Sequence, residues 1–350
     1  MRAMFLDADH VSASSRPSLR LADTPAPEPL DDEALVRVAT CGVCRTDLDL
    51  VEGRLRAPRY PVVPGHQIVG RVERVGRSVR GLENGERVGV AWIHSACGVC
   101  AWCRAGMENL CPYFRSTGCD VNGGYAEFVT APAAFVYRVP DNLGDAEAAP
   151  LLCAGAIGWR SLRLTNLHDG DPLGLTGFGA SAHLVLQIAR ARFPRSKVYV
   201  FARSAGEREF ALSLGAAWAG PTEESPPVAL RAIIDTTPAW RPVVWALRAL
   251  APGGRLVINA IRKSNADIGE LTTLDYGRDL WMEREVKSVA NVTRTDVAEM
   301  LAYASSAGIR PTVGVVPLER ANDALSALRS GGGADGGGVR GAQVLRVAES

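Results

Sequence analysis

Short apolar runs interrupted by single polar residues dominate residues 1 to about 150. Residues 35–38 (Leu-Val-Arg-Val) and 68–72 (Ile-Val-Gly-Arg-Val) are two such runs. Turn-forming residues separate them, for example Asn84-Gly85 and Asn122-Gly123-Gly124. Short strands with frequent turns predict a closed or partly closed β structure for this part of the chain.

The pattern changes after Pro150, because apolar strand-like runs now alternate with helical stretches. The expected strands are 173–176, 198–201, 232–234 and 256–258, and the expected helices include 180–192 and 206–215. Such alternation is typical of a parallel sheet covered by helices. The fold class is therefore predicted to be α/β.

The last part of the chain returns to mixed elements. Helices are expected near 296–307 and 318–329, followed by a final strand at 343–347. The run 331–338 contains six glycines and is expected to be a flexible loop.

Length, charge and cysteine content limit the class of protein. A chain of 350 residues suits two domains. The net charge of +1 gives no field that would recruit nucleic acid or a membrane, and no apolar run is long enough for a membrane helix. Eight cysteines without a visible secretion signal predict a cytoplasmic protein with reduced thiols, in which clustered cysteines favour metal binding.

Four cysteines form one dense cluster, Cys97, Cys100, Cys103 and Cys111. Four thiolates in a short loop can close a tetrahedral zinc site, so a structural zinc ion is expected here. Disulfides and an iron–sulfur cluster are the alternatives. The reducing compartment argues against disulfides, and the interval before Cys111 is too long for the ferredoxin spacing.

Three further candidates lie far apart: Cys44 within Cys-Gly-Val-Cys-Arg-Thr-Asp, His66 within Pro-Gly-His-Gln, and Cys153 within Leu-Leu-Cys-Ala-Gly. With the cysteine cluster and a later nucleotide fingerprint, they occur in the order found in the zinc-dependent alcohol dehydrogenases of the medium-chain dehydrogenase/reductase family, which the chain resembles over nearly its whole length. The resemblance implies that Cys44, His66 and Cys153 hold a catalytic zinc ion.

The resemblance also implies roles for neighbouring residues. Thr46 matches the hydroxyl that begins proton transfer, and Arg45 matches a position that meets the cofactor pyrophosphate. Asp47 is expected to orient His66. Many members place a histidine three residues after the relay hydroxyl, where this chain has Asp49, a candidate proton acceptor. Many members also have glutamate after the histidine ligand, where this chain has Gln67.

A glycine-rich turn follows the expected strand 173–176. Gly177 and Gly179 fit the first two glycines of G-x-G-x-x-G/A, and Ala182 fits the third position. Such a turn lets the backbone approach a pyrophosphate at a helix N-terminus. Beyond the next strand, Arg203 and Ser204 stand where NAD-binding sites usually carry an acid. NADP(H) is therefore expected over NAD(H), because Arg203 could bind a 2′-phosphate.

The family resemblance further implies a GroES-like β-barrel catalytic domain at 1–150 and 296–350 around a Rossmann domain at 151–295, with substrate in the cleft between them. The predicted enzyme is an NAD(P)-dependent oxidoreductase with two Zn²⁺ per chain, which acts on an alcohol and its aldehyde or ketone. A homo-dimer or homo-tetramer is expected. The alternatives are a reductase of activated carbon–carbon double bonds, a zinc-ribbon binding module and a non-catalytic cofactor sensor.

Overall fold

The chain packs into two compact units in the computed structural model, which describes residues 1–12, 16–330 and 340–348. One unit combines Met1–Cys153 with Asn291–Ser350, and the other is Ala154–Ala290. The expected loop at 331–338 lies outside the described residues. Within the described ranges, no helix has both the length and the apolar character needed to cross a membrane.

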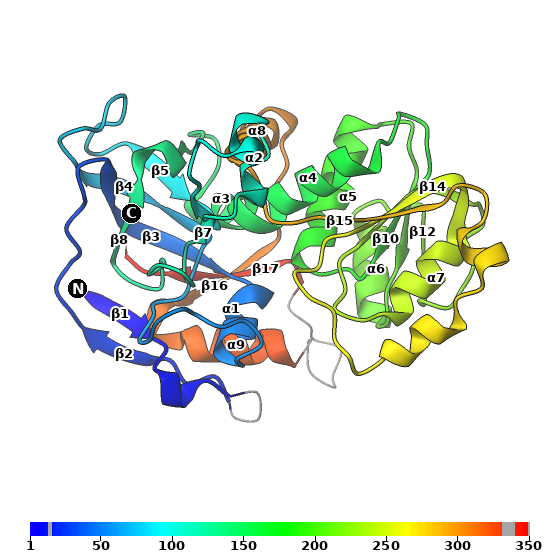
Figure 1. The fold of residues 1–350 in the computed structure, drawn as a ribbon, viewed down its shortest axis with the longest axis horizontal. Helices are drawn as coiled ribbons and strands as arrows, with labels where there is room; N and C mark the ends of the chain where they lie inside the picture. Colours follow the sequence, from blue (N-terminus) through cyan, green and yellow to red (C-terminus); the bar gives the residue numbers. More distant parts are fainter. Residues whose placement is uncertain (13–15, 331–339, 349–350) are drawn as a thin grey trace. The chain divides into compact units, whose positions relative to one another are not determined.

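The first unit, which we call the catalytic unit, is built on a mainly antiparallel sheet in which only the described pair β16 and β17 is parallel (Figure 1). Its strands are β1 (Arg2–Phe5), β2 (Arg20–Asp23), β3 (Glu33–Val43), β4 (Ile68–Val75), β5 (Arg87–Val90), β6 (Ile93–Ser95), β7 (Arg115–Ser116), β8 (Phe128–Pro132), β9 (Val136–Arg138), β16 (Val313–Pro317) and β17 (Ala342–Arg346). Its helices are α1 (Arg45–Val51), α2 (Ala101–Arg104), α3 (Asp145–Pro150), α8 (Arg294–Ala307) and α9 (Ala321–Arg329).

The long strand β3 organises the larger sheet of this unit. The strand order is β16-β17-β3-β4-β5-β9, and β8 also pairs with β3. Strand β17 pairs antiparallel with β3, so residues from the end of the chain complete a sheet that begins near its start. Val36, Val38, Ile68 and Leu345 belong to one buried core that this arrangement creates.

The second unit, which we call the nucleotide unit, alternates strands and helices as the sequence predicts. Its strands are β10 (Leu173–Thr176), β11 (Val198–Phe201), β12 (Trp218–Gly220), β13 (Leu230–Asp235), β14 (Leu250–Ile258) and β15 (Glu285–Ser288), and its helices are α4 (Ala156–Thr165), α5 (Ala180–Arg192), α6 (Ala205–Ser213) and α7 (Arg241–Ala249). All six strands are parallel, in the order β12-β11-β10-β13-β14-β15. This is the Rossmann order, and its reversal point lies between β10 and β13. The predicted α/β fold class is confirmed.

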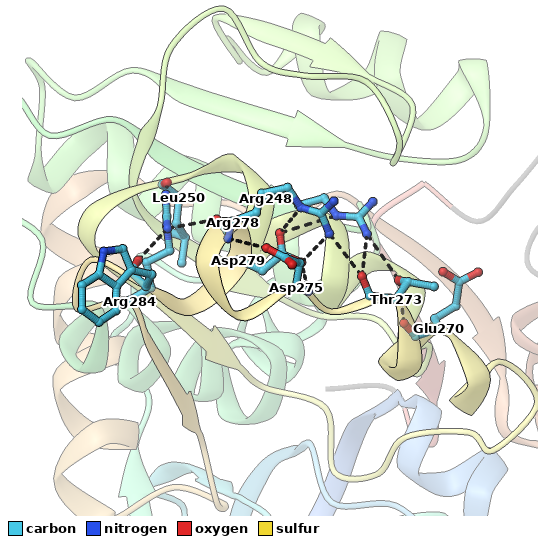
Figure 2. Close-up of polar contacts among 9 residues, drawn as sticks. Arg248, Leu250, Glu270, Thr273, Asp275, Arg278, Asp279 and Arg284 are labelled. Atoms are coloured by element: carbon cyan, nitrogen blue, oxygen red, sulfur yellow. Dashed lines mark hydrogen bonds and ion pairs between the residues drawn. The ribbon is translucent and has the colours of Figure 1, made fainter.

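A buried carboxylate holds together the irregular segment between β14 and β15 (Figure 2). Asp279 is fully buried, and Arg278 donates to its two oxygens at 2.6 and 2.7 Å. Arg248 lies 3.7 Å from the same carboxylate, and the backbone amide of Asp275 donates to it at 2.9 Å. The Arg278 contacts lower the pKa of Asp279 against the opposing effect of burial, so this carboxylate stays ionised.

Replacing Arg278 with methionine is expected to lower the free energy of unfolding by about 1–2 kcal/mol, because Asp279 loses two charge-assisted hydrogen bonds but keeps Arg248 and a backbone amide. Urea denaturation followed by circular dichroism measures the change. Arg195→Met is the matched control, because its partner Asp169 lies at the surface and the pair is exposed. The control should change stability by less than about 0.5 kcal/mol, and an equal loss in both variants would contradict the prediction.

Candidate functional site

Three potential metal ligands converge in the catalytic unit. Cys44 is the N-cap of α1 directly after β3, His66 precedes β4, and Cys153 follows α3. Their donor atoms all lie within 4.8 Å of one another, and the Cys44 and Cys153 sulfurs are 4.0 Å apart. His66 is 1% exposed, and its Nε2 has no hydrogen-bond partner among the described residues. A buried donor without a partner beside two sulfurs fits a metal ion.

Asp47 ties two of these ligand segments together. Its carboxylate accepts the backbone amides of Cys44 at 2.8 Å and Gly65 at 3.2 Å. The same carboxylate lies 3.2 Å from His66 Nδ1, the position from which a carboxylate fixes the ring of a metal-binding histidine. The Tyr125 hydroxyl donates to it at 3.3 Å. Tyr125 was not predicted from the sequence, because a single tyrosine far from either motif carries no local signal.

Gly65 is the residue that lets His66 reach this position. Its φ is +99°, a conformation that side chains disfavour, and an added Cβ would lie 2.4 Å from the Tyr125 ring and 2.8 Å from the Cys41 sulfur. Trp92 packs edge-on against the His66 ring at 4.9 Å between centroids. The imidazole is therefore held by a carboxylate on one side and an aromatic ring on another.

The surroundings of the three ligands stabilise positive charge. Contact with the Cys153 thiol lowers the pKa of Cys44 well below its usual value, although burial opposes this, so a thiolate is favoured. Burial lowers the pKa of His66, but Asp47 and Cys44 outweigh it and raise that pKa to about 10. A group of anionic donors that can hold a proton can hold a metal cation in its place.

The remaining residues that the sequence proposed for this site are spread around α1. The Thr46 hydroxyl is 3.7 Å from the Cys44 sulfur, whereas Arg45 is exposed at the start of the helix. Asp49 is buried, and its carboxylate accepts a hydrogen bond from Arg54 Nε at 2.6 Å. Because Asp49 has a cationic partner, it could accept a proton only if its contact with Arg54 weakens. Its role as a proton acceptor stays a prediction.

The four-cysteine cluster forms a second group of metal donors in the same unit. The sulfurs of Cys97, Cys100, Cys103 and Cys111 all lie within 4.8 Å of one another. Backbone amides point at these sulfurs, including Cys97 N to Cys111 Sγ and Cys100 N to Cys97 Sγ, both at 3.4 Å. Backbone hydrogen bonds lower the pKa of Cys97 to about 6, which favours the thiolate that zinc binds.

The glycine-rich turn of the nucleotide unit lies between β10 and α5, at the reversal point of the sheet. Gly177 has φ +76°, and an added Cβ would lie 2.9 Å from Thr237. Gly179 caps the N-terminus of α5, and nothing lies within 4 Å of where its Cβ would be. Ala182 is fully buried under this turn. An open approach to the amides of a 13-residue helix fits a pyrophosphate.

The end of β11 carries the residues expected to contact the adenosine ribose. Arg203 is exposed, and its guanidinium has no partner among the described residues. Ser204 caps α6 by accepting the Glu207 amide at 3.1 Å, and Glu207 returns a contact to the Ser204 amide at 3.4 Å. The Glu207 carboxylate is thus engaged in the helix cap, which leaves Arg203 as a charged group available to bind a ligand at the end of β11.

Known proteins resemble this chain in sequence and in fold. Residues 30–141 match the alcohol dehydrogenase GroES-like domain family. A probable alcohol dehydrogenase AdhA of Mycobacterium tuberculosis is 44% identical over 318 residues, which cover 89% of this chain and 90% of the relative. An alcohol dehydrogenase of Geobacillus stearothermophilus is 32% identical, with 90% and 93% of the two chains covered.

A solved structure agrees with the sequence relatives. The cinnamyl alcohol dehydrogenase SbCAD4 from Sorghum bicolor is 27% identical, with 100% of this chain and 98% of that chain covered and a TM-score of 0.86. The two sequence relatives named above match about nine-tenths of this chain, and the solved structure shares its fold over the whole chain. The chain therefore belongs to the alcohol dehydrogenases of the medium-chain dehydrogenase/reductase family.

Proposed function

We propose that this protein is a zinc-dependent alcohol dehydrogenase that transfers a hydride between NADP(H) or NAD(H) and an alcohol with its aldehyde or ketone. The observation that carries the proposal is the convergence of Cys44, His66 and Cys153 around a shared position. Two thiolates and one neutral imidazole would give a zinc site with no net charge and a fourth position for substrate. The second group of four cysteines would hold a structural zinc ion.

The proposed mechanism assigns separate tasks to the residues of the catalytic site. A bound zinc ion would lower the pKa of the alcohol hydroxyl or polarise the carbonyl, and a bound nicotinamide would exchange the hydride. Asp47 holds His66 and the backbone at Cys44 in place, so the ligand set is fixed before substrate binds. Thr46 would accept the hydroxyl proton at Oγ1 and pass it on, with Asp49 as a candidate acceptor beyond it.

A panel of alcohols and aldehydes, each assayed with NADP(H) and NAD(H) before and after chelation, tests the proposal. We expect oxidation of alcohols and reduction of aldehydes or ketones, and loss of both activities together with loss of zinc. Reduction of activated carbon–carbon double bonds alone, with full activity after chelation, would contradict the proposal and favour a reductase of the same fold.

We further propose that the cofactor is NADP(H), held by Arg45 and the turn at Gly177 and Gly179, with Ala182 packing beneath. Arg203 would bind the 2′-phosphate, and Ser204, as the N-cap of α6, would hold the backbone next to Arg203 in position. Replacing Arg203 with alanine is expected to lower kcat/KM for NADPH by about 10- to 100-fold, because one charge-assisted contact is lost. The kcat/KM for NADH should change by less than about threefold, because a hydrogen bond between a guanidinium and an uncharged ribose hydroxyl contributes little binding energy.

A matched arginine separates a specific contact from a loss of positive charge. Arg190 also lies in the nucleotide unit, but it donates to the backbone oxygen of Leu214. Arg190→Ala should leave the ratio of the NADPH and NADH values unchanged. A wild-type preference for NADH, or an equal effect of Arg203→Ala on both cofactors, would contradict the proposed role.

We also propose a cytoplasmic homo-oligomer, a dimer or a tetramer. All eight cysteines are free thiols in the structure, which suits a reducing compartment. Strand β15 lies at the edge of its sheet with all four residues exposed, and exposed edge strands tend to pair with another chain. Sedimentation velocity of the purified protein tests the assembly, and a monomer at micromolar concentration would contradict it.

A further inference from the structure

A pocket in the catalytic unit lies among residues that the proposed reaction does not use. It has a volume of about 390 Å³. The walls come from β1, β6, β7, β8 and the loops beside them, and they include Phe5, Val63 and Phe128. None of the proposed metal ligands lines it. The pocket therefore needs an explanation other than catalysis.

Two cationic side chains line this pocket without partners. Arg59 and Arg115 are exposed, and neither guanidinium has a hydrogen bond or ion pair within the part of the chain that the structure describes. Most arginines of this unit behave differently; Arg87, for example, contacts Asp145 at 2.6 Å. Two unpaired guanidinium groups in one pocket favour an anion with oxygen acceptors.

A buried histidine provides an independent indication of a ligand. His94 is 5% exposed, lines the pocket, and leaves its Nδ1 without a hydrogen-bond partner among the described residues. The pairing of β6 with β7 shifts register between Ile93 and Ser95, which makes His94 the extra residue of a bulge. Bulges redirect side chains and recur next to binding sites. A buried polar atom of this kind is usually satisfied by a partner, which a ligand would supply.

The acidic residues of the pocket are already engaged. Glu28 pairs with Arg74, and Glu33 accepts the backbone amide of Leu30 at 3.0 Å. They leave Arg59 and Arg115 as the groups free to bind. Because the other walls of the pocket are aromatic and aliphatic, a ligand that fills it would also need a small apolar body.

We propose that this pocket binds a small organic acid, with its carboxylate between Arg59, Arg115 and His94 and its apolar body against Phe5 and Phe128. The site is separate from the proposed metal centre and needs neither zinc nor nucleotide. Because Arg115 and His94 lie on the two strands that flank the four-cysteine cluster, a bound acid would join the two strands at the base of that cluster.

Calorimetric titration of the zinc-loaded protein with sodium benzoate and with benzamide tests the proposal. Both probes have the same aromatic body, but only benzoate carries the charge. We expect benzoate to bind with a millimolar or lower Kd and benzamide to bind at least about fivefold more weakly, as one screened charge-assisted contact implies. Equal binding of the two probes would overturn the proposal. The absence of benzoate binding at about 20 mM would overturn it as well.

Variants distinguish this pocket from the metal centre, where a carboxylate could also bind. Arg59→Gln and Arg115→Gln should each weaken benzoate binding by at least about fivefold. The matched control is Arg104→Gln, because Arg104 is another exposed arginine of this unit outside the pocket. Benzoate binding that is unchanged in both pocket variants, or that competes with the alcohol in kinetics, would place the anion at the metal centre and overturn the proposal. Inorganic phosphate binding more tightly than benzoate would equally overturn it, since the apolar walls would then contribute nothing.

Discussion

Replacing Cys44 with serine is expected to remove one of the two proposed zinc ions and to lower kcat/KM for alcohol oxidation by at least about 1000-fold. A serine hydroxyl is a poor zinc ligand near neutral pH, so the three-ligand set of Cys44, His66 and Cys153 is broken. The loss follows because a zinc ion contributes several kcal/mol to stabilising the developing alkoxide. Zinc content by mass spectrometry and steady-state kinetics measure the two effects separately.

Two other cysteines provide the controls for this experiment. Cys119 is buried in the core, lies outside both groups of metal donors, and its thiol lies 3.8 Å from the backbone oxygen of Arg56. Cys119→Ser should keep both zinc ions and activity within about threefold of the original. Cys103→Ser should remove the other zinc ion. Two zinc ions and full activity in Cys44→Ser would show that the three side chains do not form the catalytic site.

The sequence predicts the architecture well because its signals are local. The alternation of apolar runs with helical stretches is set by neighbouring residues, so α5 spans the expected 180–192 and β11 the expected 198–201. The four-cysteine cluster is also local, since its members lie within 15 positions. Family resemblance was needed for the return of the final strand, because pairing between β17 and β3 joins opposite ends of the chain.

The side-chain networks behind the site could not be predicted in the same way. Tyr125 donates a hydrogen bond to Asp47, and Arg54 pairs with Asp49. The spacing of these residues in the sequence does not predict either contact. The pairing changes how Asp49 is understood, because the buried carboxylate already has a partly exposed cationic partner, and its role in proton transfer stays a prediction. Sequence patterns identify groups that bind metal and nucleotide, whereas the residues that hold these groups in place emerge from packing.

A buried ion pair beside the nucleotide turn is another such contact. Asp235 is fully buried at the end of β13, where it accepts the Thr176 hydroxyl at 2.5 Å and the Thr237 hydroxyl at 2.8 Å. Lys263 forms an ion pair with its second oxygen and donates to the backbone oxygens of Thr237 and Ala239 at 2.8 and 3.0 Å. Thr237 lies against Gly177, so this network supports the floor of the proposed cofactor site.

Replacing Lys263 with methionine is expected to lower the free energy of unfolding by about 3–5 kcal/mol, because a buried carboxylate loses its counter-charge. Urea denaturation of the zinc-loaded protein measures the loss. Lys197→Met is the matched control, since Lys197 is exposed, and should change stability by less than about 0.5 kcal/mol.

Adding Asp235→Asn to Lys263→Met distinguishes an uncompensated charge from a loss of packing. Asparagine keeps an oxygen for the hydroxyls of Thr176 and Thr237 but carries no charge, so the double variant should recover at least about 1 kcal/mol relative to Lys263→Met alone. A double variant that is less stable than Lys263→Met would mean that the hydrogen bonds accepted by the Asp235 carboxylate, and not compensation of its charge, stabilise this edge of the sheet. Recovery would instead identify electrostatic compensation of Asp235 as the reason that a lysine occurs beside the proposed cofactor site.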